Sequence, residues 1–134
     1  MATRANIGYK QDDGSYRYIY THWDGYPSHM GATLLEHYTD PEKIKRLVEN
    51  GSLSSIGPEC DGAEGHTFNT PVKGQTIYYG RDRGETDVEP KTTMSRDEIH
   101  EQEFAYVYEN GYWICSGACD IGWIPLSKAV LLEN

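Results

Sequence analysis

An Asn110-Gly111 pair between two alternating apolar segments is the feature that most constrains how this chain can fold. Asn-Gly favours the left-handed backbone of a two-residue hairpin turn. Phe104, Tyr106 and Tyr108 occupy every second position before the pair, and residues 112–115 are again aromatic and apolar after it. The sequence therefore predicts two antiparallel strands joined by a tight turn.

A second hairpin is predicted at the other end of the sequence. Residues 5–9 and 16–21 have the composition of strands, and the Asp-Asp-Gly-Ser stretch at 12–15 between them is a turn signal. Side chains alternate along a strand, so the three tyrosines at every second position from Tyr16 to Tyr20 share one face. One strand face of this hairpin is therefore rich in tyrosine.

Two helices are predicted between the hairpins. Apolar residues recur at helical spacing from Met30 to Tyr38. A second helix starts at Asp40, a good N-cap followed by Pro41, and ends at Gly51. Its apolar face comprises Ile44, Leu47 and Val48. The connection is short, so we expect a central αα-hairpin.

These elements define the fold class. Strands at both ends and helices between them predict an α+β domain with a largely antiparallel sheet, in which N- and C-terminal hairpins pack against the central αα-hairpin. Residues 1–134 are expected to form one domain, with a long irregular loop at about 51–74. Residues 75–79 read as a short strand, and Ser95 begins a capping-box pattern that predicts a short helix to about Gln102.

The net charge of the chain limits the classes of partner that it is expected to bind. Twenty-one acidic residues against twelve basic ones give a net charge of −9, which repels a phosphate backbone, so we expect no general nucleic-acid binding. The acidity either maintains solubility or docks on a basic partner. No apolar run has the length of a membrane span, and three cysteines do not form a disulfide framework. We expect a soluble, cytoplasmic protein that does not bind membranes.

The first candidate motif is His22-Trp23-Asp24-Gly25-Tyr26-Pro27. His22 and Asp24 can form the imidazole–carboxylate pair of a general base, or they can simply cap a strand end and a turn. The rings of Trp23 and Tyr26 offer flat faces for stacking on a ligand. We favour the motif as part of a binding surface.

The second candidate motif is Arg81-Asp82-Arg83-Gly84-Glu85, which follows Tyr79. Two arginines on one loop can clamp a phosphate or carboxylate, and neighbouring aromatic rings suit a nucleotide base. Asp82 and Glu85 can hold ribose hydroxyls or orient the arginines. The alternative is a solvated loop whose charges neutralise one another.

Other chemistry has weaker support in the sequence. Cys60, His66, Cys115 and Cys119 lack the paired spacing of a zinc site, so we expect no metal. No glycine-rich phosphate loop, dinucleotide fingerprint or nucleophile elbow is present, and we expect no cofactor.

One likeness covers nearly the whole chain, on residues 3–4, 7–8, 20–27, 34–38, 51–54 and 79–85. These stretches, above all the His-Trp-Asp-Gly-Tyr-Pro run, resemble a group of small accessory proteins encoded by tailed phages and prophages. The resemblance implies a viral protein that acts in the cytoplasm of a bacterial host. Small accessory proteins of this kind often blunt host defence. The resemblance implies no catalytic residue.

Three functional hypotheses follow. In the first, a counter-defence protein sequesters a small anionic, nucleotide-derived ligand without turnover. Its binding residues are drawn from the two motifs: His22, Trp23, Asp24, Tyr26, Tyr79, Arg81, Asp82, Arg83 and Glu85. In the second, the protein inhibits a host defence protein through an acidic, tyrosine-rich surface, because tyrosine and tryptophan often anchor interfaces.

The third hypothesis is a small nucleotide hydrolase. Its catalytic residues come from the same motifs: His22, Asp24, Asp82 and Glu85. The first and third hypotheses both require that residues 22–27 and 81–85 meet in space. A tyrosine-rich face or a sheet edge can also mediate a homo-oligomer. The absence of a standard catalytic signature favours binding over catalysis.

Overall fold

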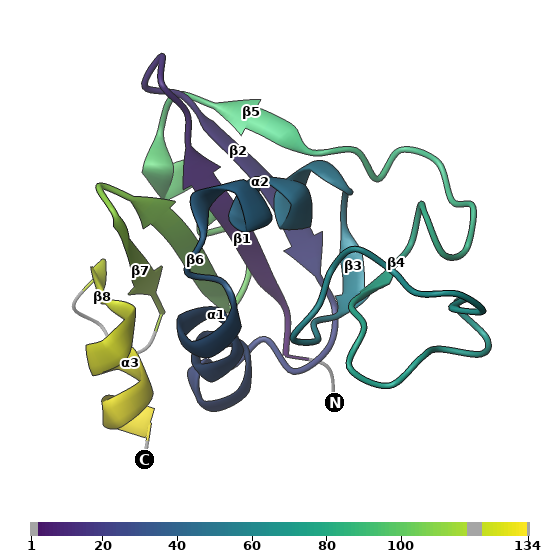
Figure 1. Cartoon of the computed structure of the whole chain (residues 1–134). Helices are drawn as coiled ribbons and strands as arrows, with labels where there is room; N and C mark the ends of the chain where they lie inside the picture. The colour runs from purple at the N-terminus through teal and green to yellow at the C-terminus, as the bar shows by residue number, and fades with distance from the viewer. Residues whose placement is uncertain (1–2, 118–121, 134) are drawn as a thin grey trace.

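The computed structural model describes residues 3–117 and 122–133, which form an eight-stranded sheet with three α-helices on one face (Figure 1). The order across the sheet is β4-β3-β2-β1-β6-β7-β8, and β5 also pairs with β2. The strands are β1 (Ala5–Lys10), β2 (Tyr16–Thr21), β3 (Leu53–Ser55), β4 (Ile77–Tyr78), β5 (Lys91–Thr93), β6 (Phe104–Glu109), β7 (Tyr112–Ser116) and β8 (Ile124–Pro125). The helices are α1 (Ala32–His37), α2 (Pro41–Glu49) and α3 (Leu126–Glu133), with a π-helical turn η1 (Pro27–Gly31) and a 3₁₀ turn η2 (Arg96–Ile99).

Both predicted hairpins are confirmed. Strands β1 and β2 pair antiparallel, with Ile7 opposite Ile19. Strands β6 and β7 do the same around Asn110 and Gly111, whose φ angles of 55° and 87° are left-handed as the turn requires. The α+β class and the mostly antiparallel sheet are confirmed as well. The hairpins join through a parallel pairing of β1 with β6, and β2 pairs in parallel with β3.

The predicted α2 helix forms for the predicted reasons. The Asp40 carboxylate accepts a hydrogen bond from the Glu42 amide at 3.1 Å, which satisfies one of the unpaired donors at the helix start. Gly51, at φ 95°, takes the left-handed conformation that ends the helix. The apolar face of α2 is buried against β1 and β2.

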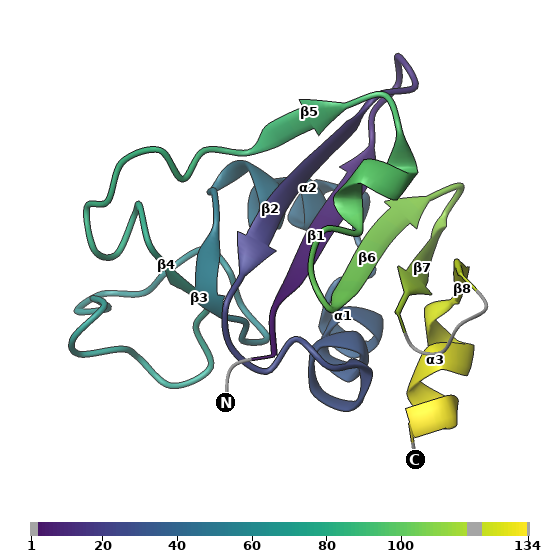
Figure 2. The same cartoon turned by 180° about the vertical axis from the view of Figure 1, so that it is seen from behind.

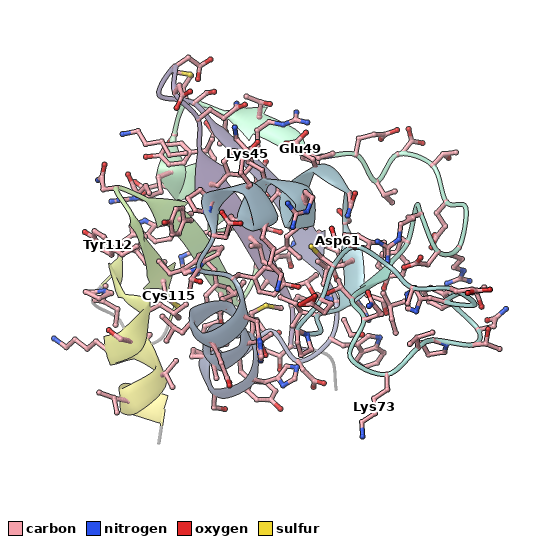
Figure 3. The ribbon with its side chains drawn as sticks, viewed as in Figure 1. Lys45, Glu49, Asp61, Lys73, Tyr112 and Cys115 are labelled. Atoms are coloured by element: carbon pink, nitrogen blue, oxygen red, sulfur yellow. The ribbon has the colours of Figure 1, made fainter. Side chains whose placement is uncertain are left out.

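The C-terminal end of α2 is also tied to the N-terminal hairpin. Glu49, at the edge of the helix in Figure 3, accepts hydrogen bonds from the Tyr9 hydroxyl at 2.9 Å and from Arg17 at 2.7 and 3.0 Å. Burial and the neighbouring Glu49 carboxylate raise the pKa of Tyr9 to about 12. This cluster holds the helix across the strands.

The predicted apolar stripe from Met30 to Tyr38 is confirmed, because Met30, Leu34 and Tyr38 are fully buried. The helix begins as the π-helical turn η1 at Pro27 and becomes regular at Ala32. Three residues, 38–40, separate α1 from α2, and α3 packs on η1 and β7.

The opposite face of the sheet, seen in Figure 2, carries η2 and a second, smaller apolar cluster. This cluster comprises Tyr16, Tyr18, Ile99, Ala105, Val107 and Ile114. The helix predicted from Ser95 to about Gln102 is wrong in length, because only one 3₁₀ turn forms. The capping box does not close: the Ser95 amide donates to the Thr93 hydroxyl, and that hydroxyl donates to Glu98.

The segment predicted as an irregular loop at 51–74 contains strand β3, which the sequence did not predict. Tertiary pairing forms this strand, since Leu53 pairs with Thr21 on one side and Tyr78 on the other. Strand β8 lies at one edge of the sheet and pairs with β7. No helix in the described part of the chain is long and apolar enough to cross a membrane.

Candidate functional site

The His22–Pro27 motif connects β2 to η1 and secures the start of β1. The Gly25 amide donates to the Thr3 carbonyl at 2.9 Å, and its carbonyl accepts from the Tyr106 hydroxyl at 2.5 Å. A Cβ on Gly25 would lie 2.8 Å from both the Thr3 oxygen and the Ala5 Cβ, so glycine is required for this close approach. Asp24 before it has a left-handed φ of 55°. The motif therefore has a structural role.

The predicted His22–Asp24 pair does not form. The Nδ1 of His22 instead lies 2.7 Å from the Tyr20 hydroxyl, and the His22 ring meets Trp23 edge-on at 4.7 Å. Among the described residues, no hydrogen bond or ion pair joins Asp24 to an imidazole. Trp23 is 43% exposed, and Tyr26 is half-buried beside His29. The motif carries no assembled general base.

The second motif forms a closed turn after β4. The Glu85 amide donates to the Tyr79 carbonyl at 3.0 Å, so the chain returns to where it began. Tyr79 is in turn anchored to Ser52 through its amide, at 3.2 Å. Glu85 and Tyr79 therefore lie together next to β2, whereas the middle of the turn faces the long segment between β3 and β4.

Arg81 is bound within the protein rather than displayed to solvent. Its guanidinium donates to both carboxylate oxygens of Asp82, at 2.9 and 3.0 Å, and to the carbonyls of Cys60 and Thr76 at 2.6 and 3.2 Å. It also stacks on the Tyr78 ring at 4.7 Å. Four of the five guanidinium N–H donors are thus used internally.

Asp82 is the centre of this internal network. Its side chain is only 4% exposed and also accepts from the Tyr78 amide at 2.8 Å and from His66 at 3.2 Å. Burial opposes ionisation of Asp82, but the hydrogen bonds from Arg81 and Tyr78 outweigh it and hold the pKa of this carboxyl below its ordinary value. The network fixes the β3–β4 segment to the sheet.

Arg83 contacts a different part of the protein from Arg81. Its guanidinium lies 4.8 Å from the Phe68 ring, and its Nε is 3.7 Å from Glu85. Phe68 is 5.9 Å from the Tyr79 ring. Arg81 and Arg83 therefore do not converge on one position from which they could hold a single anion.

A shallow hollow of about 490 Å³ opens beside the internal network. Asp61, Glu64, His66, Arg81 and Asp82 line it, together with Gly62 and Ala63. Asp61 is paired with Arg46 on α2, and Lys73 projects away on the far side of the same segment (Figure 3). Because its arginine is already satisfied and its other charged groups are carboxylates, the hollow has little to offer an anion.

A deeper pocket of about 420 Å³ lies on the face of the sheet opposite the helices. Tyr18, Tyr20 and Asn6 contribute to it from β2 and β1. Residues 101–102 line one part, after η2, and Tyr79 with residues 85–91 lines another. Figure 2 shows the segment that joins β4 to β5 looping out beyond β3 before it reaches β5, which lies beside β2. Ser52 helps shape the pocket, since its hydroxyl accepts from the Tyr20 amide at 3.2 Å.

The charge of this pocket is negative. Four carboxylates line it, from Glu85, Asp87, Glu89 and Glu101, against one ammonium group from Lys91. In the described part of the chain, Asp87, Glu89 and Glu101 make no ion pair or side-chain hydrogen bond. Burial is the main cause that raises the pKa of Tyr18, and the charges of Glu101 and Glu98 raise it further.

The pocket combines two predicted residues, both from the second motif or the strand before it, with others that the sequence did not predict. Among the predicted site residues, Tyr79 and Glu85 line it, and His22 touches it only through Tyr20. The others, Trp23, Asp24, Tyr26, Arg81, Asp82 and Arg83, line other surfaces or the internal network. The residues not predicted are Asn6, Tyr18, Ile19, Tyr20, Ser52, Asp87, Val88, Glu89, Lys91, Glu101 and Gln102. The acidic alternation at 85–89 was the signal that could have found part of this set.

Neither the comparisons with known proteins nor the placement of metal-ligating side chains assigns a function to this pocket. A comparison of the chain with protein-family models, curated proteins and solved structures finds no match. Within residues 3–117 and 122–133, no group of three histidine, cysteine or carboxylate side chains is placed to hold a metal ion. Cys119, one of the residues considered for zinc, lies outside the described residues.

Proposed function

We propose that this protein is a non-enzymatic binding protein whose acidic, tyrosine-lined pocket receives a positively charged side chain of a partner protein. The observation that carries the proposal is the pocket itself, with four carboxylates and three tyrosines around about 420 Å³. A cation gains from the carboxylates by Coulomb attraction and from the rings by cation–π contact. An anion would meet repulsion from the same groups.

The pocket charge favours this function over sequestration of a nucleotide. A phosphate needs several converging donors, and among the described residues Lys91 is the one cationic side chain that lines the pocket. Arg81 is satisfied internally and Arg83 lies over Phe68. Sequestration of an anion therefore depends on a rearrangement of the turn at 81–85, whereas binding of a cation needs none.

Two arguments support a protein as the source of the cation. The net charge of −9 extends the attraction beyond the pocket and accelerates association with a basic surface. Tyrosine-rich surfaces are typical of protein interfaces. The resemblance to phage accessory proteins supports a host defence protein as the partner, and this last step rests on that resemblance alone.

Catalysis has less support than binding. The His22–Asp24 pair proposed for a hydrolase is not assembled, and Asp82 is enclosed by Arg81 and His66. Among the described residues, no hydrogen bond or ion pair joins His22 to Asp24, Asp82 or Glu85.

The test compares probes of opposite charge on the same sample. Thermal melting and calorimetry with a capped arginine- and lysine-containing peptide, and with ATP and a cyclic dinucleotide, separate the hypotheses. A ligand at about 100 times its dissociation constant adds about 2.7 kcal/mol of stability. The proposal expects the basic peptide alone to bind. Binding of the nucleotides alone would replace it with sequestration, and recovery of an altered nucleotide would make the protein an enzyme.

A further inference from the structure

We infer that the pocket is built for a guanidinium group, so that its ligand is an arginine side chain of the partner rather than a lysine. This inference rests on the proposed function and specifies its ligand. It is carried by two polar side chains at the floor of the pocket that are almost fully buried and have unused oxygens.

The first is Asn6, which is 3% exposed and lines the pocket. Its Nδ2 donates to the Ile99 carbonyl at 2.9 Å, which fixes the amide and leaves Oδ1 as the other end. Among the described residues Oδ1 accepts no hydrogen bond. An amide oxygen with its orientation set and its lone pairs unused is an acceptor ready for a donor from the ligand.

The second is Tyr18, which is 7% exposed. Its hydroxyl has no hydrogen-bond partner in the described part of the chain, while its ring packs in the smaller apolar cluster. In the same residues, Thr21 Oγ1 is the only side-chain oxygen or nitrogen that is both fully enclosed and unpartnered. The Asn6 and Tyr18 oxygens are therefore not fully enclosed, and because both residues line the pocket, we infer that a ligand there can donate hydrogen bonds to them.

These acceptors suit a planar donor with several N–H groups. Guanidinium presents five N–H donors in a rigid fork. It can therefore donate hydrogen bonds to Asn6 and Tyr18 at the floor of the pocket and to a carboxylate such as Glu101 at its wall. Its flat face also stacks on tyrosine, and it is less strongly hydrated than ammonium. A lysine ammonium has three donors on a compact, well-hydrated centre and loses more on entering the pocket.

The experiment uses three blocked pentapeptides, Gly-Gly-X-Gly-Gly, with arginine, lysine or citrulline at X. Citrulline keeps the shape of arginine and removes its charge. Affinities are measured by titration of backbone amide shifts in the full chain. We expect the arginine peptide to bind about tenfold tighter than the lysine peptide, the ratio for one extra charged hydrogen bond, and the citrulline peptide to bind weakest.

The variant Tyr18→Phe keeps the ring and removes the unused hydroxyl. It should lower affinity for the arginine peptide about tenfold and reduce the preference over lysine. Tyr112→Phe is the matched control, because Tyr112 is 51% exposed at the far edge of the sheet (Figure 3). Equal binding of arginine and lysine peptides would overturn the inference and leave the proposed function standing. No binding of either peptide, or citrulline binding as well as arginine, would overturn both.

Discussion

Asn6 on β1 and Tyr20 on β2 are directly paired across the N-terminal hairpin, so their side chains share the sheet face that carries the acidic pocket. Asn6 is locked by Ile99, and Tyr20 is locked by His22. The floor of the pocket is therefore formed by the regular β1–β2 hairpin. Most of its walls are formed by irregular segments. A floor of this kind favours a pre-organised site that needs little ordering on binding.

The charge of the pocket should control affinity for a basic peptide. Glu101→Gln and Glu85→Gln should each weaken binding about fivefold, because one partly exposed charge pair contributes about 1 kcal/mol. Lys91→Gln should strengthen binding, because it removes the repulsive ammonium group. The measurement is calorimetry at low and physiological salt. Unchanged or weaker binding of the basic peptide by Lys91→Gln would contradict this role of the pocket charge.

The network around Asp82 should determine stability rather than binding. Asp82→Asn removes the charge that holds Arg81 and His66, and we expect a loss of about 2 kcal/mol in the free energy of unfolding. Affinity for the basic peptide should stay within about twofold of wild type. Urea denaturation together with the peptide titration checks both. A stable variant with no peptide binding would contradict this assignment.

The same residue predicts a dependence of stability on acid pH. The folded-state pKa of Asp82 is lower than its ordinary value of 3.8, so ionised Asp82 stabilises the fold fully above that value. This stabilisation is lost as the pH falls through the lower folded-state pKa. The difference in unfolding free energy between wild type and Asp82→Asn should therefore shrink with acid below about pH 4. A difference that stays constant to pH 2 would contradict the prediction.

His66 should exist as one neutral tautomer. Its Nδ1 accepts a hydrogen bond from the Val72 amide at 2.9 Å, so Nδ1 carries no proton and Nε2–H is the donor to Asp82. Long-range ¹⁵N–¹H correlation spectra at neutral pH distinguish the two tautomers directly. Observation of the Nδ1–H form would show that this part of the network is arranged differently.

Gly25 should be intolerant of a side chain although it does not line the acidic pocket. Gly25→Ala places a methyl group against the Thr3 carbonyl and the Ala5 side chain, and we expect a cost of about 2 kcal/mol from overpacking. Asp24→Gly is the matched control, since glycine readily takes the left-handed φ of 55° there. Thermal melting should show a clear fall in Tm for the first and little change for the second.

Local signals account for the part of the fold that the sequence predicted. The Asn110-Gly111 turn and the Asp40 cap act within a few residues, so the hairpin and helix α2 could be placed without a structure. Strands β3 and β5 are three residues each and form because β2 offers them an edge, which no local pattern records.

The site was harder to predict for the same reason. Arg81 looks like an anion ligand in the sequence, yet the buried carboxylate beside it, Asp82, captures it. The pocket joins residues from β1, β2, the segment around 85–91 and residues 101–102. Tertiary contacts alone bring these parts together, so neither their proximity nor the unused oxygens of Asn6 and Tyr18 could be derived from the sequence.

The most direct test of the acidic pocket is to map where a basic ligand binds. Backbone amide shifts of the ¹⁵N-labelled protein are recorded during titration with the blocked arginine pentapeptide. The account predicts the largest changes on β2 at Tyr18–Tyr20, on the segment 85–91 and at residues 101–102. Changes centred on residues 22–27 or 81–83, or no saturable change at all, would contradict it.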